Sequence, residues 1–361
     1  MPNTSALRRF ALSFAAATLL CAVVTAPTLL GAQQPAAPAP SSTAPSQPYH
    51  VIDHWKIGGE GGWDYLNADP GAHRIYIAHG TRVDVVDTTA GKVIGAITGL
   101  HGVHGIALDT AGKFGYISDG GGNAVVVFDR SALAIVSTVP AGTNPDCILF
   151  EPATKTVWAF NGRSHDVSVI NTTSNSVIAT IPLDGRPEFA VADGQGNVFD
   201  NLEDKSEIVR IDARTRAITA TWPAGCDSPS GLALDIAGHR LFPVCDGRKM
   251  SVIDSTTGKL LANPSIGDGP DAAGFSAAHS LTFASSGDGI LSVVDASAPG
   301  YPTIESLTTQ RGARTMAYDP STDRVYLVTA DFGPRPEPTP ENPRPRPAVI
   351  PGSFTVIVVG R

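Results

Sequence analysis

The sequence contains none of the short motifs that identify the common enzyme families. It has no Gly-x-Ser-x-Gly nucleophile elbow, no P-loop, no His-Glu-x-x-His, no Cys-x-x-Cys-His haem site and no Rossmann glycine pattern. Histidine and aspartate occur in several loops, but the sequence places neither of them beside a serine nucleophile. The chain therefore offers little support for covalent catalysis.

The chain also has few helical patterns and few charged residues. Apolar residues seldom recur at the i, i+3, i+4 and i+7 spacing of an amphipathic helix, so we expect almost no helix after the N-terminal leader. Charged residues make up only 17% of the chain, whereas glycine is abundant at 37 residues. This composition suits tight turns between half-buried strands.

Residues 1–32 are predicted to be a Sec-type signal peptide. Arg8 and Arg9 supply the positive start, residues 10–24 form an apolar run, and residues 30–32 end in a small-residue cleavage site. A transmembrane anchor is the alternative, but the run is shorter than the roughly 20 residues that span a bilayer. Residues 33–48, rich in Pro, Ala and Ser, are expected to be a tether without a core. These features predict a bacterial periplasmic or secreted protein.

The charge of the chain argues against nucleic acid as a partner. The net charge is −8, and loss of the two leader arginines brings it to about −10. An acidic chain lacks the basic surface that sequence-independent nucleic-acid binding requires. No second apolar run is long enough to span a membrane, and we expect the mature chain to be a monomer.

A short strand that closes on an acid or an amide recurs along the chain. Six copies close at Asp87, Asp129, Asn171, Asp212, Asp254 and Asp295, which are 42, 42, 41, 42 and 41 residues apart. The seventh copy closes at Val358, 63 residues later, which is one period plus an insertion. A period of about 40 residues made of short strands is typical of propeller blades. We predict an all-β, seven-bladed β-propeller with four antiparallel strands per blade.

The two ends of the repeat predict how the propeller closes. Residues 49–59 have the pattern of a lone fourth strand, and residues 316–358 have the pattern of three strands without a fourth. We therefore expect one propeller domain over residues 49–361, whose last blade is completed by the N-terminal strand. Such closure removes two open sheet edges.

Two segments carry a resemblance to a known family. Residues 324–329 read Arg-Val-Tyr-Leu-Val-Thr, and residues 166–171 read Asp-Val-Ser-Val-Ile-Asn. With the recurring Gly-x-x-Pro turn, they resemble the YVTN-repeat, or YncE-like, seven-bladed propellers of bacterial envelopes. The resemblance covers about residues 49–361 and implies the fold, but the family has no single shared activity. Some YncE-like relatives bind nucleic acid, which the acidic charge and the leader disfavour here.

One position in each blade falls at the same place in the repeat but varies in identity. Prolines 145, 187, 229 and 270 precede the first strand of four blades, as expected of a turn device. The residue after each proline and its equivalents in the other blades are Asp64, His104, Asp146, Glu188, Ser230, Asp271 and Arg314. A purely structural position should repeat one residue type. Because equivalent propeller loops meet at one channel mouth, we predict that these seven residues, the channel-mouth ring, bind a ligand.

The ring admits three interpretations. Carboxylates and an imidazole can together hold a divalent cation such as Ca or Zn. The candidate metal ligands are Asp64, His104, Asp146, Glu188 and Asp271. Alternatively, Arg314 and nearby Arg311 can bind a carboxylate or a phosphate, or the ring consists only of solvated turn residues. Crowding of these charges should perturb some pKa values, which marks functional candidates.

The loops between the second and third strands should open on the same face as the ring. They carry His79, Asp119, His165, Glu203, Asp204, Asp246 and Asp288. They also carry the insertion at residues 332–353, whose eight prolines favour extended polyproline II. A loop this long in a compact domain is functional or disordered. We expect a lid over the mouth, an arm that docks a partner, or a tolerated surface insertion.

Three cysteines, Cys147, Cys226 and Cys245, remain after the leader. Folding residues 231–235 back on residues 240–244 places Cys245 opposite Ser230, with Cys226 in the preceding loop. Exported proteins meet conditions in which disulfides persist, so we predict a Cys226–Cys245 disulfide. Cys147 is expected to be a small core residue.

These observations predict an exported propeller that binds a small ligand or an envelope protein, or acts as a scaffold, through its channel-mouth loops. Similarity to propeller lactonases, which place carboxylates and in some families a metal at the channel mouth, implies an alternative. That alternative is a metal-dependent hydrolase in which the ring holds the metal and supplies a base. Apart from a possible divalent cation, the sequence indicates no cofactor.

Overall fold

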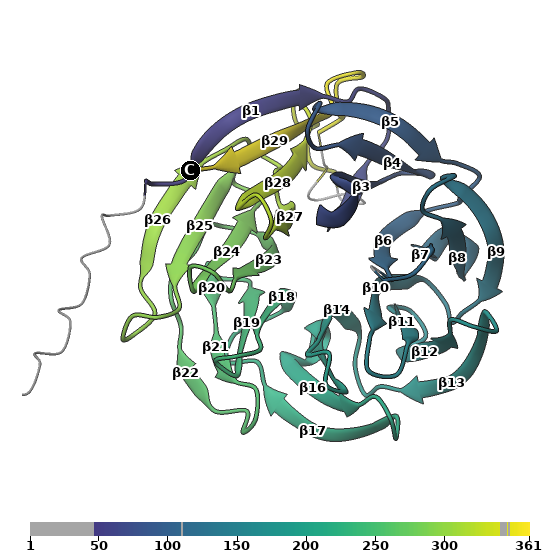
Figure 1. Cartoon of the computed structure of the whole chain (residues 1–361). Coiled ribbons are helices and arrows are strands. Elements are labelled where there is room, and N and C mark those ends of the chain that lie inside the picture. Colours follow the sequence, from purple (N-terminus) through teal and green to yellow (C-terminus); the bar gives the residue numbers. More distant parts are fainter. Residues whose placement is uncertain (1–46, 110, 340–344, 346) are drawn as a thin grey trace, which may run out of the picture. The chain divides into compact units, whose positions relative to one another are not determined.

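The computed structural model describes residues 47–109, 111–339, 345 and 347–361. The predicted leader and most of the predicted tether lie outside the described residues. The unit Ser46–Arg361 contains seven antiparallel sheets, which follow one another around a ring (Figure 1). The structure therefore has the predicted fold, a seven-bladed β-propeller.

Each blade runs from an innermost strand a to an outermost strand d. The a strands are β2 (Trp63–Asp69), β6 (Val103–Leu108), β10 (Pro145–Glu151), β14 (Pro187–Ala192), β18 (Pro229–Asp235), β23 (Pro270–Ser276) and β27 (Thr315–Asp319). The b strands are β3 (Arg74–His79), β7 (Phe114–Asp119), β11 (Thr156–Asn161), β15 (Asn197–Leu202), β19 (Arg240–Cys245), β24 (Leu281–Ser286) and β28 (Arg324–Thr329). The c strands are β4 (Arg82–Asp87), β8 (Ala124–Asp129), β12 (Asp166–Asn171), β16 (Glu207–Asp212), β20 (Lys249–Met250) with β21 (Val252–Asp254), β25 (Ile290–Asp295) and β29 (Thr355–Gly360). The d strands are β5 (Lys92–Ile97), β9 (Ala134–Pro140), β13 (Ser176–Pro182), β17 (Ala217–Pro223), β22 (Leu260–Ala262), β26 (Thr303–Thr308) and β1 (His50–Lys56).

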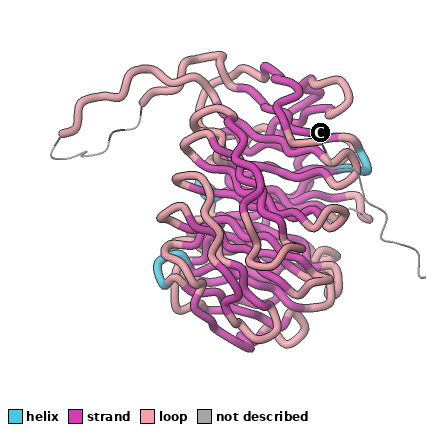
Figure 2. The backbone as a smooth tube through the Cα atoms, turned by 90° about the vertical axis from the view of Figure 1, so that its left-hand side faces the viewer, coloured by secondary structure: helices cyan, strands magenta, loops and turns pink. Residues whose placement is uncertain are grey.

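Helix is nearly absent from the described residues, as the sequence predicts. Three one-turn 3-10 helices occur, η1 (Pro70–Ala72), η2 (Gly120–Gly122) and η3 (Glu203–Lys205). The side view in Figure 2 shows strands joined almost entirely by loops. Within the described part of the chain, no helix has both the length and the apolar character needed to cross a membrane.

The residue that closes each copy of the repeat shapes the turn after it. In six blades its side-chain oxygen accepts hydrogen bonds from two backbone N–H groups of the turn between strands c and d. Asp212, for example, accepts from Thr215 at 2.7 Å and from Arg214 at 2.9 Å. Such turns require Asp or Asn. Val358 needs no such side chain, because its blade takes strand d from the other end of the chain.

The N-terminal strand completes the last blade, as predicted. Strand β1 pairs antiparallel with β29 from His50↔Gly360 to Lys56↔Thr355, and Figure 1 shows the purple and yellow strands side by side. Trp55 packs against Tyr326 of β28 at 5.6 Å between ring centroids. Tyr49 meets Phe283 of the neighbouring blade edge-on at 5.1 Å. Closure therefore joins the last blade both to the start of the chain and to the sixth blade.

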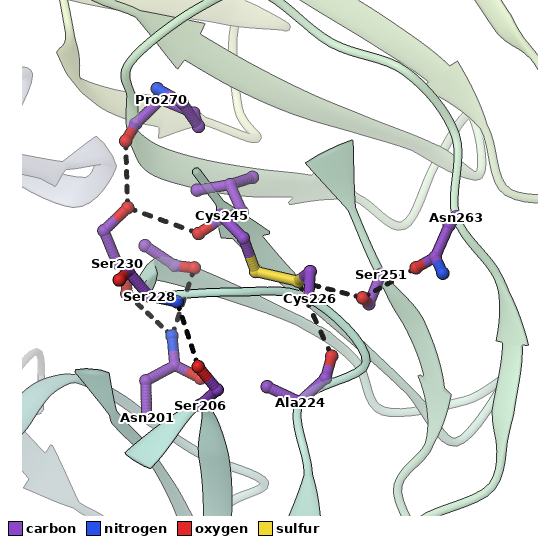
Figure 3. Close-up of a disulfide and its surroundings, with 12 residues drawn as sticks. Asn201, Ser206, Ala224, Cys226, Ser228, Ser230, Cys245, Ser251, Asn263 and Pro270 are labelled. Atoms are coloured by element: carbon purple, nitrogen blue, oxygen red, sulfur yellow. Dashed lines mark hydrogen bonds between the residues drawn. A yellow bond between two sulfur atoms is a disulfide. The ribbon is translucent and has the colours of Figure 1, made fainter. Parts of the chain in front are cut away.

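The fifth blade contains the predicted Cys226–Cys245 disulfide, which spans 19 residues (Figure 3). Its neighbour Ser251 donates a hydrogen bond to the Cys226 sulfur at 3.0 Å. One detail of the prediction is wrong, because Cys245 pairs with Pro229 and not with Ser230. A β-bulge after Pro229 shifts the register of β18 by one residue. Cys147 is free and buried, as predicted.

Removal of β1 tests how the ring closes. A chain that starts at Gly58 leaves β29 as an open edge and loses two buried aromatics, Tyr49 and Trp55, each contributing roughly 2–3 kcal/mol. We expect it to melt at a much lower temperature, without the sharp transition of a control chain that starts at Gln47. Circular dichroism of both chains makes the comparison. Equal melting temperatures would show that β1 does not close the propeller.

Candidate functional site

An irregularity in the innermost strand precedes each of six ring residues. In strands β2, β6, β10, β14, β18 and β23 the pairing with strand b breaks directly after the first paired residue. Asp64, for example, lies between the pairs Trp63↔His79 and Leu66↔Ile77. A bulge redirects a side chain and is often found next to an active site. The break in pairing interrupts the alternation of side chains between the two faces of the sheet at the ring residue. The seventh ring residue, Arg314, lies just before β27.

Three ring residues meet in one cluster. His104 Nδ1 lies 2.7 Å from an Asp64 carboxylate oxygen and 3.6 Å from Asp146 Oδ1. One ligand atom from each of the three lies within 4.8 Å of the others. The side chains are only 20–27% exposed, so solvent screens their charges weakly. Three consecutive blades thus supply a partly buried trio with two carboxylates and one imidazole, which we call the Asp–His–Asp cluster.

The remaining ring residues fall into different groups. Asp271 pairs with Arg314 at 3.4 Å, and the guanidinium is the more exposed partner. Ser230 donates its hydroxyl to the carbonyl oxygens of Pro270 at 2.9 Å and Val244 at 3.2 Å. The bond to Pro270 ties β18 to the next blade, and the bond to Val244 ties it to β19 of its own blade. We therefore assign Ser230 a structural role at the channel mouth.

Glu188 is coupled to the Asp–His–Asp cluster through charge. Burial raises the pKa of Glu188 to about 8, and the charges of Asp146 and Asp271 add to the rise. Burial likewise raises the pKa of Asp146 to about 6. Burial disfavours the charged form of His104, but the Asp64 hydrogen bond and the nearby carboxylates outweigh it and raise the pKa to about 9. Without a cation, the ring therefore retains protons that these groups would release in water.

Two half-buried aromatic residues, Tyr65 and Phe189, directly follow the ring residues Asp64 and Glu188. The phenol of Tyr65 donates to the backbone oxygen of Glu188 at 3.3 Å, and its ring meets Phe189 edge-on at 5.1 Å. Burial and the carboxylates above it raise the pKa of Tyr65. A cavity of about 340 Å³ is lined by Tyr65, Cys147, Phe189 and other a-strand residues. The lining includes the residue directly after each of four ring residues, namely Tyr65, Gly105, Cys147 and Phe189. The polar channel mouth therefore opens on a mostly apolar cavity.

Sequence reasoning missed Asp200, which lies on β15. Asp200 is fully buried, and neither of its carboxyl oxygens has a hydrogen-bond partner among the described residues. Burial, with the nearby charge of Glu188, raises its pKa well above the usual range. Its neighbour Asn201 donates to the Ser230 carbonyl at 2.7 Å. The available signal was this Asp–Asn pair, which follows the apolar Val198 and Phe199 and precedes Leu202 in β15.

Three of the seven ionisable residues expected in the b–c loops accept hydrogen bonds from the backbone of a d–a loop. Asp119 accepts from the N–H groups of His101 and Gly102, at 2.9 and 2.8 Å. Asp204 and Asp288 accept equivalent bonds in their own blades, from Arg186 and Asp268. His79 is buried and pairs with Asp84 at 2.7 Å. Asp119, Asp204 and Asp288 therefore hold d–a loops next to the ring, whereas His79 bonds to Asp84 on β4.

The fold places the chain in a class of proteins, the seven-bladed β-propellers with a WD40-like fold. Similar solved structures include "Kuenenia stuttgartiensis Hydrazine Synthase", at 14% identity and a TM-score of 0.66, over 74% of this chain and 92% of that one. "Structure of U3-55K" and "Crystal structure of RRP9 WD40 repeats" match at 11% identity and a TM-score of 0.69, over 86% of this chain and 98% and 97% of theirs. At such identities the similarity shows the fold alone.

Two further comparisons found no relative. No protein-family model matches the chain, and no curated protein matches it. The resemblance to YncE-like propellers therefore stays a prediction. The structural neighbours support only the coarser assignment to a WD40-like propeller.

The raised pKa values predict the sign of the pH dependence. Asp146, Glu188 and His104, with pKa values of about 6, 8 and 9, bind more protons in the folded than in the unfolded chain. The free energy of unfolding of the metal-free protein should therefore fall as the pH rises from about 4 to about 9. Glu188→Gln removes one of these groups, so its melting temperature should fall less than that of wild type between about pH 5 and 8.

Thermal melts in the presence of a chelator make this comparison. Glu60→Gln changes an exposed glutamate and serves as the control. Parallel pH profiles for wild type and Glu188→Gln would contradict the assigned pKa of Glu188.

Proposed function

We propose that the protein is an exported binding module whose channel mouth holds one divalent cation in the Asp–His–Asp cluster. The observation that carries the proposal is the convergence of Asp64, His104 and Asp146 within 4.8 Å from three separate blades. The bound cation and the surrounding loops would then present a site for a small ligand or an envelope partner. The Cys226–Cys245 disulfide fits the predicted export, because disulfides persist in oxidising compartments.

The spacing of the cluster supports a metal site. Two ligands of one tetrahedral zinc ion lie about 3.3 Å apart when each bond is about 2.0–2.1 Å long. The distances from His104 Nδ1, 2.7 Å to Asp64 and 3.6 Å to Asp146, lie on either side of that value. An imidazole ligand favours zinc or a similar transition metal over calcium, which prefers oxygen ligands. We therefore place zinc before calcium.

Electrostatics also supports a cation. Asp146, Glu188 and Asp200 all have raised pKa values because their carboxyl groups are buried close to one another. Burying carboxylates without a compensating positive charge disfavours folding. A divalent ion would let these groups ionise, since metal binding displaces protons.

Calorimetric titration of the purified, chelator-treated chain with zinc, calcium or manganese tests the proposal. We expect one cation per chain and a higher melting temperature in its presence. His104→Gln and Asp64→Asn should each weaken binding by at least about tenfold, because each removes a ligand. Asp184→Asn, in an exposed loop between blades, is the matched control and should bind as wild type does. Saturable binding with the same affinity in wild type, His104→Gln and Asp64→Asn would refute the site.

A hydrolase is the second candidate function. Three protein ligands leave one coordination position for water, which is the arrangement of catalytic zinc sites. Glu188, whose pKa is raised to about 8, is suited to exchange protons near neutral pH. The metal would then polarise a carbonyl or activate water for attack on an ester or a lactone.

An assay of γ-butyrolactone hydrolysis by the cation-loaded chain tests this alternative. The release of protons measures the turnover. We expect turnover to fall by at least about 100-fold in Glu188→Gln, in line with the loss of a general base. Its cation affinity should fall less than that of Asp64→Asn, because Glu188 interacts with the cluster through charge and is not one of its three ligands. The absence of cation-dependent turnover in wild type would leave binding as the function.

A further inference from the structure

A second cavity of about 390 Å³ lies beside the ring and is lined by residues of the first, sixth and seventh blades. Its lining includes Trp63, Arg311, Arg314, Phe332 and Arg335. Two chemical features divide this lining, a set of arginines and an apolar wall. Only Arg314 belongs to the ring, so this cavity is chemically distinct from the Asp–His–Asp cluster.

Three arginines, Arg311, Arg314 and Arg335, are among the residues that line the cavity. Arg314 is paired with Asp271 at 3.4 Å. Among the described residues, neither Arg311 nor Arg335 has an acidic partner within salt-bridge distance. The whole chain carries a net charge of −8, whereas this cavity is lined by three positively charged arginines. Such a cavity attracts anions.

Aromatic side chains form the opposite wall. The ring centroids of Trp63 and Phe332 lie 6.0 Å apart, and Phe354 supports Trp63 from 5.3 Å. Both Trp63 and Phe332 are half-buried, so part of each ring still faces solvent. The wall thus offers an apolar surface on which a flat or aliphatic group can pack.

The base of the insertion holds this wall in place. Phe332 pairs with Val349 in an isolated β-bridge, and the Gly333 N–H donates to the Ala348 carbonyl at 2.8 Å. Gly312 has a φ of +84°, and a Cβ there would lie 2.8 Å from the Phe332 ring. The d–a loop of the seventh blade can therefore approach Phe332 closely only with glycine at this position.

We infer that this cavity binds a small organic anion, with a carboxylate or phosphate held by Arg311 and Arg335 and an apolar body packed against Trp63 and Phe332. A planar guanidinium group can bind two oxygens of a carboxylate or a phosphate through two parallel hydrogen bonds. A volume of about 390 Å³ lies within the range of small-molecule sites. The inference names a ligand class for the proposed binding module, but its anchoring residues are separate from the cation cluster.

Calorimetric titration of the chelator-treated chain with 2-naphthoate at low salt tests the inference. We expect saturable binding of one molecule per chain, and binding at least about tenfold weaker for the neutral analogue 2-naphthalenemethanol. Arg311→Ala and Arg335→Ala should each weaken 2-naphthoate binding by about tenfold, and the double variant should weaken it further. Arg163→Ala, an exposed arginine in another b–c loop, is the matched control and should leave binding unchanged.

Three results would overturn the inference. These are no saturable binding of 2-naphthoate, equal binding of the neutral analogue, or unchanged binding by the Arg311→Ala/Arg335→Ala double variant. Inorganic phosphate, titrated alone, should bind more weakly than 2-naphthoate, because it has no apolar body to pack against Trp63 and Phe332. Equal affinities would show that the aromatic wall does not contribute to binding. The double variant should still bind the cation, so failure of the anion site and failure of the cation site give different results.

Discussion

The antiparallel pairing of β1 with β29 is the contact on which the rest of the structure depends. A propeller has no single core, because each sheet packs only on its two neighbours, and an open ring would leave the first and seventh blades each with one uncovered face. The pairing brings Trp55 onto Tyr326 and Tyr49 onto Phe283, so the start of the chain seals the last blade. Closure also brings Trp63 of the first blade to Phe332 of the seventh.

Within the closed ring, a regular scaffold carries an irregular site. The turns between strands c and d repeat one hydrogen-bond pattern, in which Asp or Asn accepts two backbone N–H groups. By contrast, the bulged starts of the a strands carry residues that differ between blades. Where these residues are acidic and close together, burial raises their pKa values, as it does for Asp146 and Glu188. The repeated positions therefore hold the turns in place, and the varied positions form the candidate site.

The sequence predicted the fold well because the fold is encoded in local, repeated signals. The spacing of Asp87, Asp129 and their equivalents reflects turn chemistry that operates within a few residues. The site was harder to predict, since its details depend on contacts between blades. The pattern grouped Ser230 with Asp146, yet Ser230 bonds to backbone carbonyls and Asp146 joins His104. Asp200 lies outside the repeat position, and its burial near the charge of Glu188 becomes visible only in the structure.

The most direct test of the cation site is crystallographic. A crystal of the protein is soaked with zinc, and diffraction data are collected at the zinc absorption edge. The anomalous signal then shows where zinc is bound. The proposal predicts one strong anomalous peak about 2.0–2.2 Å from His104 Nδ1 and from carboxylate oxygens of Asp64 and Asp146. Peaks only at surface histidines, with none between these three side chains, would contradict it.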